Sequence, residues 1–208
     1  MIYGSRELID RVNDSDGKLD LPEELKAGPE MVLRGACVGL QKMTYLPGHG
    51  VYEYPYTPES FPWFYDKEQW IKYLDMLVAN RMNSLYLWNG HPFASLVKLE
   101  DYPFALEVDE ETFKMNEEMF SFLTEEADKR GIFVIQMFYN IIRSKPFAEH
   151  YGLKTQDRNR PITPLIADYT RKSITAFIEK YPNVGLLVCL GEAMCTVEDD
   201  VEWFTKTI

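Results

Sequence analysis

The sequence is poor in cysteine, histidine and long apolar runs, and it carries fewer basic than acidic residues. Its three cysteines do not make a disulfide framework, and Cys189 and Cys195 fit no short metal spacing, so each is interpreted as a small buried apolar residue. No apolar run reaches the roughly 18 residues of a membrane helix, so no membrane partner is expected. Phosphate binding needs a basic patch, and 22 Lys and Arg against 33 Asp and Glu give a charge of −11, so no nucleic acid partner is expected.

Motifs of several enzyme classes are also missing. The 208 residues hold no glycine-rich dinucleotide fingerprint, no Walker loop, no paired-histidine zinc motif and no nucleophile elbow. His49 and His91 are interpreted as loop histidines, because no other His or Cys stands at ligand spacing. We therefore expect neither a metal nor a cofactor. Residues 1–5 lack the features of a signal peptide, so we expect a cytoplasmic protein unless a signal segment lies upstream, which would make it secreted or periplasmic.

The hydrophobic pattern predicts alternating strands and helices. Residues 1–30 are expected to form a linker helix and a charged connection from an upstream domain, and residues 31–208 a domain of β/α units. Predicted strands cover 31–40, 83–88, 132–138 and 184–190, and predicted helices cover 66–81, 109–130, 163–180 and the residues from 197. Asp66 and Asp109 are the expected N-caps of the first two of these helices. The continuous apolar run at 132–138 predicts a strand buried on both faces.

This order of elements predicts an α/β fold with a parallel sheet, because the crossovers are long enough for parallel pairing. Two architectures fit, an open doubly wound sheet or the first four units of a TIM (β/α)8 barrel. The last helix reaches Ile208 without a visible C-cap, and a charged segment precedes the first strand, which favours the barrel. A half barrel would expose strand edges and one apolar flank of its sheet, so we expect self-association or a missing C-terminal half.

Reactive groups are expected where the strands end, because the strand-to-helix loops of parallel sheets open there. The residues that follow the four predicted strands are Gln41, Lys42 and His49, then Trp88, Asn89 and His91, then Tyr139, Asn140 and Arg143, and last Gly191, Glu192 and Met194. The first loop, 41–65, is long and rich in proline and aromatic residues, and it is expected to stack on sugars or to pack as a lid with its own small core. Rings, amides and one carboxylate suit a polyhydroxylated substrate.

Charged residues near these strands allow two interpretations each. Glu192 directly follows a buried strand, so desolvation would raise its pKa and suit it to proton donation, but it could instead be stabilised by the dipole of the next helix. Arg34 lies in an apolar strand and must find either a salt-bridge partner or a ligand. The basic residues expected to gather in one loop, either solvated or as an anion-binding rim, are Arg143, Lys145, Lys154, Arg158 and Arg160.

Three segments resemble known glycoside hydrolases. Residues 3–9, followed by Leu33-Arg34-Gly35, resemble the junction that precedes strand one of the barrel in family 20 hexosaminidases and family 67 α-glucuronidases. Residues 74–83, with the strand that ends at Trp88, resemble the helix one and strand two signature of the same group. Residues 185–194 resemble the strand four motif of family 67 and family 115 α-glucuronidases. The resemblance implies that residues 31–208 are the N-terminal half of a (β/α)8 catalytic domain.

The resemblance also implies roles for single residues. Glu192 would be the general acid, and Arg34 would bind sugar hydroxyls in the central subsite. The expected substrate-binding residues are, in full, Arg34, Trp88, Asn89, His91, Tyr139 and Asn140. Gly191 stands where hexosaminidases carry an aspartate, which argues against substrate-assisted cleavage and favours an inverting, α-glucuronidase-like reaction. The second carboxylate of such a reaction would come from later strands.

Three functions remain open at this point. The leading hypothesis is a glycoside hydrolase that acts on a polysaccharide or oligosaccharide, with Glu192 as general acid. By analogy with the α-glucuronidases, the substrate would contain uronic acids. The alternative is a non-catalytic carbohydrate-binding or interaction protein on an incomplete barrel. A third possibility is an open-sheet enzyme of unrelated chemistry. The sequence leaves the sugar, the linkage and the general base undetermined.

Overall fold

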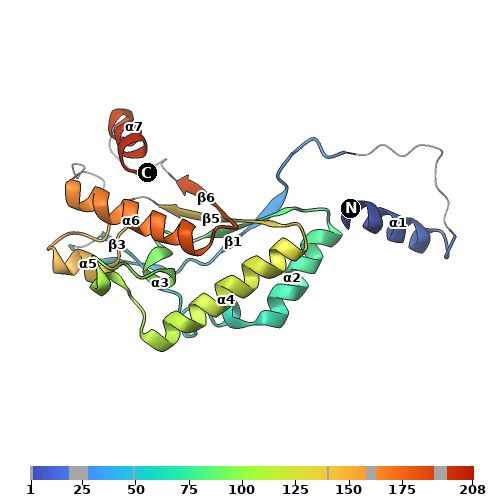
Figure 1. Cartoon of the computed structure of the whole chain (residues 1–208), viewed down its shortest axis with the longest axis horizontal. Helices are drawn as coiled ribbons and strands as arrows, with labels where there is room; N and C mark the ends of the chain where they lie inside the picture. The colour runs from blue at the N-terminus through green and yellow to red at the C-terminus, as the bar shows by residue number, and fades with distance from the viewer. Residues whose placement is uncertain (1, 19–27, 49, 140, 158–162, 190–195) are drawn as a thin grey trace.

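A computed structural model describes residues 2–18, 28–48, 50–139, 141–157, 163–189 and 196–208 of the chain. Its centre is a parallel sheet of four strands in the order β1-β4-β5-β6 (Figure 1). These strands are β1 (Gly35–Gly39), β4 (Ser84–Trp88), β5 (Phe133–Tyr139) and β6 (Val184–Cys189). The expected α/β class and the parallel pairing are therefore confirmed.

Helices separate the strands along the chain as the hydrophobic pattern predicts. They are α1 (Ile2–Asp14), α2 (Lys67–Ala79), α3 (Phe93–Leu96), α4 (Glu110–Lys129), α5 (Lys145–His150), α6 (Pro164–Lys180) and α7 (Val197–Lys206), with 3-10 turns η1 (Pro62–Tyr65) and η2 (Pro103–Ala105). Asp66 accepts the backbone N–H of Gln69 at 2.9 Å and Asp109 that of Thr112 at 2.7 Å, so both expected N-caps are confirmed. The last helix, α7, ends at Lys206, and the N–H of Thr207 donates to the Trp203 carbonyl.

The helices α2, α3, α4 and α6 bury one face of the sheet. The apolar strand residues that contact this helical layer alternate along each strand and are Ala36, Val38, Leu85, Leu87, Val134, Phe138, Val184, Leu186 and Val188. Aromatic contacts hold the layer together, since Phe120 of α4 lies 5.8 Å from Phe177 of α6 and Phe93 of α3 lies 4.9 Å from Phe138 of β5. Each such buried ring contributes about 1.5–3 kcal/mol to folding.

The other side of the sheet, here called the open face, has no such cover from the described residues. The strand side chains on it are Cys37, Tyr86, Trp88, Ile135, Met137, Tyr139, Leu187 and Cys189, and none of them belongs to the core under the helices. Exposure alternates along β5, and Phe133 is 60% exposed. The prediction that β5 is buried on both faces was therefore wrong for the described part of the chain.

The first strand is shorter and starts later than the pattern predicts. β1 begins at Gly35 instead of residue 31, and Met31 and Val32 are exposed. Arg34 therefore precedes the strand, and its guanidinium donates to the carbonyl oxygens of Arg81 at 3.0 Å and Met31 at 2.7 Å. The charge is satisfied by backbone carbonyls, which fix the turn that leads into β1.

The loop at 41–65 contains regular structure that the sequence analysis missed. An antiparallel hairpin of β2 (Met43–Leu46) and β3 (Gly50–Glu53) occupies its first half. Further along, Tyr56 and Phe64 are fully buried and lie 5.3 Å apart, and both belong to the main core under the helices, so the expected lid with its own small core was wrong for this part. The hairpin places the end of β3 beside the carboxyl end of the sheet, since the Glu53 carboxylate accepts the backbone N–H of Gly90.

The N-terminal helix α1 lies at one end of the molecule, near the end of α2 (Figure 1). Tyr3 donates its hydroxyl to the carbonyl oxygen of Met82 at 2.7 Å, and Arg81 forms ion pairs with Glu7 and Asp10. These contacts attach α1 at the amino end of the sheet, away from the strand ends where reactive groups are expected. Among the described residues, no helix is both long and apolar enough to cross a membrane.

Candidate active site

The carboxyl ends of β1, β4 and β5 are tied together by backbone hydrogen bonds beyond the strands themselves. Leu40 N–H donates to the Trp88 carbonyl at 2.8 Å, and Tyr139 N–H donates to the Gly90 carbonyl at 3.1 Å. Asn89 N–H donates to the Met137 carbonyl at 3.3 Å. The residues that follow neighbouring strands are therefore held in one small region, which is where parallel α/β folds place their sites.

A buried carboxylate from outside the sheet lies in this region. Glu53, the last residue of β3, is only 6% exposed. Its carboxylate accepts the backbone N–H of Gly90 at 3.0 Å and the side-chain amide of Gln41 at 3.3 Å. Burial raises the pKa of Glu53 to about 6, although the hydrogen bonds from Gly90 and Gln41 oppose the rise. Glu53 is a candidate site residue that the sequence analysis missed.

Aromatic side chains continue from this carboxylate onto the open face. The amide oxygen of Gln41 accepts the indole N–H of Trp88 at 2.8 Å. The Trp88 ring meets the ring of Tyr139 edge to face, with 4.9 Å between centroids. Both residues are half-buried and come from neighbouring strands, so the structure brings together two of the expected substrate-binding residues.

Asn89 and His91 point elsewhere. The Asn89 amide donates to the Leu40 carbonyl at 2.7 Å and accepts the backbone N–H of His91 at 2.8 Å. The buried His91 ring pairs its Nε2 with the Tyr169 hydroxyl at 2.7 Å, which directs it into the helical layer. Burial, together with the charge of Arg143, lowers the pKa of His91 to about 3, so the ring is neutral at physiological pH. Both side chains therefore stabilise the strand ends through protein partners.

A second, half-buried carboxylate joins the hairpin to α5. Glu107 accepts the backbone N–H of Lys145 at 2.6 Å and the hydroxyl of Tyr52 at 3.0 Å. Burial raises the pKa of Glu107 to about 7, against the opposing effect of these two hydrogen bonds. This carboxylate therefore changes its charge near neutral pH, at a contact that links β3 to the segment after β5.

Other expected site residues are not brought to this region. Arg34 precedes β1, at the amino end of the sheet, because Gly35 pairs with Ser84 whereas Gly39 pairs with Trp88. A direct role of Arg34 in a subsite at the carboxyl end is not compatible with this placement. Glu192, Asn140 and His49 lie outside the described residues, as do Cys195, Gly191 and Met194.

The expected basic loop is also divided in the structure. Lys145 begins the helix α5, and Arg143 is buried. Arg158 and Arg160 lie outside the described residues. An exposed rim of five basic side chains is therefore not what the described part of this segment forms.

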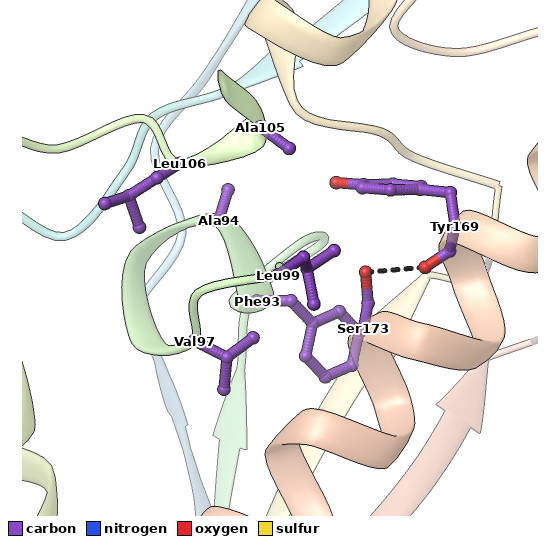
Figure 2. A pocket seen from close by; sticks show the side chains of 8 residues that line it. All are labelled: Phe93, Ala94, Val97, Leu99, Ala105, Leu106, Tyr169 and Ser173. Atoms are coloured by element: carbon purple, nitrogen blue, oxygen red, sulfur yellow. Dashed lines mark hydrogen bonds between the residues drawn. The ribbon is translucent and has the colours of Figure 1, made fainter. Parts of the chain in front are cut away.

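Two enclosed cavities under the helical layer are too small for a sugar. Figure 2 shows one of about 10 Å³, lined by apolar side chains of α3 and by Tyr169 and Ser173 of α6. The Ser173 hydroxyl donates to the Tyr169 carbonyl at 2.8 Å, and the space holds one water at most. No group of three or more His, Cys, Asp or Glu within the described ranges is placed to hold a metal ion. The open face beside the carboxyl ends of the strands is the candidate surface for a substrate, because parallel α/β folds place their sites at those ends.

Comparison with solved structures finds a close likeness. The chain is similar to a solved structure described as a GH138 enzyme targeting pectin rhamnogalacturonan II, with 82% sequence identity and a TM-score of 0.92. The match covers 99% of this chain and 24% of that chain, so the chain spans about a quarter of the enzyme's length. No protein-family model and no curated protein matches the chain. The likeness is to family GH138, and it gives no support to the resemblance to families 67, 115 and 20.

Proposed function

We propose that the protein is a glycoside hydrolase that acts on a pectic polysaccharide of the rhamnogalacturonan II class. The observation that carries the proposal is 82% identity over 99% of the chain to an enzyme described as targeting that polysaccharide. The rings of Trp88 and Tyr139 at the carboxyl end of the sheet support it, because the CH faces of sugars stack on aromatic rings.

The proposed architecture is a (β/α)8 barrel, of which residues 31–208 form the first four units and residues 1–30 the connection from an upstream domain. Three features support it. The strand order follows the chain order, the helices that pack on the sheet lie on one face, and the open face carries apolar side chains such as Ile135, Met137 and Leu187. In a closed barrel, side chains of the remaining strands would fill the space against this open face.

The proposed general acid is Glu192. It follows β6 by three residues, which is the position expected for a group that reaches the carboxyl ends of the strands. A glycosidase uses two carboxyl groups, one of which protonates the leaving oxygen. The partner of Glu192 would come from the later strands.

The proposed substrate-binding residues also change with the structure. Trp88 and Tyr139 keep their role at the open face, and Asn140 remains a proposal because it directly follows β5. Asn89 and His91 are proposed to position the strand end instead of contacting sugar, since their polar atoms bond to the protein. Arg34 is proposed to stabilise the entry to β1.

The test uses the full-length gene product and oligosaccharides prepared from rhamnogalacturonan II. Release of sugar, measured by anion-exchange chromatography, is expected from the wild type, and Glu192→Gln should reduce turnover by about two to four orders of magnitude. Glu198→Gln, a change at a charged residue near the start of α7, is the matched control and should retain activity. Binding without any release of sugar would overturn the hydrolase proposal in favour of a carbohydrate-binding protein, and a fully active Glu192→Gln variant would exclude that residue as the acid.

A further inference from the structure

A chain of hydrogen bonds, here called the relay, runs from the hairpin to the open face. It begins at the buried carboxylate of Glu53, which accepts Gly90 N–H on one oxygen and the Gln41 amide on the other. It continues from the Gln41 oxygen to the indole N–H of Trp88 at 2.8 Å. It ends at the Trp88 ring, which packs edge to face with Tyr139.

The chemistry of the end groups fixes the direction of the relay. An indole N–H can only donate, so Gln41 must present its oxygen to Trp88 and its NH2 to residue 53. The backbone N–H of Gly90 also can only donate. The two donors reach different oxygens of residue 53, so this position must supply two acceptor oxygens, which a carboxylate has and a carboxamide has not.

The end of a hairpin does not require a buried carboxylate for its stability. Desolvating a carboxylate is costly unless it is hydrogen-bonded, so a purely structural contact would be made at lower cost by an apolar residue or a neutral amide. The contacts of Glu53 lead instead to one aromatic ring on the open face. We infer that Glu53 is a positioning residue that holds Trp88, through Gln41, in the orientation in which its ring stacks on a sugar of the substrate. The part of this inference that concerns sugar rests on the proposed function.

Two variants test the order of donors and acceptors along the relay. Glu53→Gln leaves one acceptor at position 53, so either Gly90 N–H or the Gln41 amide loses its partner. The double variant Glu53→Gln/Gln41→Glu reverses the order of the groups. The carboxylate introduced at position 41 accepts both Trp88 N–H and the amide at position 53, whose oxygen still accepts Gly90 N–H. A relay therefore predicts that the second change rescues the first.

Glu107→Gln is the control for loss of a neighbouring, half-buried carboxylate. Its partners are the Lys145 N–H and the Tyr52 hydroxyl, and the hydroxyl can turn to accept a hydrogen bond from the new amide. These two hydrogen bonds involve neither Gln41 nor Trp88. The control thus removes a carboxylate from the same hairpin region without leaving a donor or acceptor unpaired.

The first readout is the kinetics of the full-length gene product on rhamnogalacturonan II oligosaccharides. Glu53→Gln is expected to raise KM roughly five-fold with little change in kcat, since one net hydrogen bond is lost and stacking acts on bound substrate and transition state alike. The double variant should return KM to within about two-fold of the wild type, and Glu107→Gln should remain there. Equal effects of Glu53→Gln and the double variant on KM would overturn the relay.

The second readout does not depend on activity. In the same protein labelled with 5-fluorotryptophan, the ¹⁹F signal of Trp88 is assigned by its loss in Trp88→Phe. Glu53→Gln is expected to shift or broaden this signal, the double variant to restore it, and Glu107→Gln to leave it in place. An unmoved signal in Glu53→Gln overturns the inference, and a moved signal with an unchanged KM overturns its link to sugar stacking. If the wild type releases no sugar, the proposed function fails while the fluorine signal still decides the relay.

Discussion

Gly90 lies against Glu53 so closely that the glycine leaves no space for a side chain. Its N–H donates to one oxygen of the carboxylate at 3.0 Å, and a Cβ at Gly90 would lie 2.9 Å from the other oxygen. The same Cβ would lie 2.8 Å from the Cδ1 of Ile142. The turn after β4 therefore has room for the backbone N–H of residue 90 beside Glu53 but no room for a side chain there.

Gly90→Ala is expected to lower the free energy of unfolding by about 1–3 kcal/mol, because the added methyl forces Glu53 or Ile142 to move. Chemical denaturation with urea measures the change. Gly39→Ala is the control, since a Cβ there meets no atom within 4 Å. Equal stability of the two variants would show that the turn relaxes without strain.

His91 should make the protein less stable in acid. Burial lowers its folded pKa to about 3, from the ordinary 6.5, so the unfolded chain binds a proton that the folded chain does not. This contribution to stability is complete above about pH 6.5 and is lost by up to ~1.4 kcal/mol per pH unit as the pH falls toward about 3. Urea unfolding across this range should show a steeper loss in the wild type than in His91→Phe. Parallel pH curves would contradict a neutral buried ring.

Glu107 should make the protein less stable as the pH rises, which is the opposite of the effect of His91. Burial raises its folded pKa to about 7 from the ordinary 4.5, so the folded chain keeps a proton that the unfolded chain has released. Its favourable contribution is complete below about pH 4.5 and is lost as the pH rises toward about 7. The free energy of unfolding of the wild type, minus that of Glu107→Gln, should therefore fall across this window. A difference that stays constant with pH would contradict the raised pKa.

The open face should make the 208-residue chain self-associate when it is produced alone, because Ile135, Met137 and Leu187 lie on a side of the sheet that the described residues leave uncovered. Leu187→Lys is expected to shift the chain toward monomer in light scattering. The control is Val201→Lys, at an exposed position on α7. Monomeric wild-type chain at several concentrations would contradict this prediction.

Local signals in the sequence were sufficient for the framework of the fold. The helix caps at Asp66, Asp109 and Thr163 act through residues three positions along the chain, so a short window of sequence contains both partners. The order of strands and helices follows from the same kind of local pattern. Helix α3, with four residues, is too short to produce a period.

The remaining features depend on distant partners. The apolar run of β5 looks the same whether one face or two are covered, because what covers a face lies elsewhere in the chain. Glu53 looks like one carboxylate in an aromatic loop until the fold brings Gly90, 37 residues later, against it. Arg34 was placed in the strand because apolar neighbours flank it, whereas carbonyl groups near residue 81 determine its position.

The strand order β1-β4-β5-β6 has a consequence for synthesis on the ribosome. Each strand of the sheet pairs with the sheet strand that left the ribosome immediately before it, and no strand has to insert between two that are already paired. The sheet can therefore grow vectorially during translation, one helix and one strand at a time. The outer edge of β6 pairs with no strand of the described residues, and chaperones that bind nascent chains would have most reason to protect the sheet there.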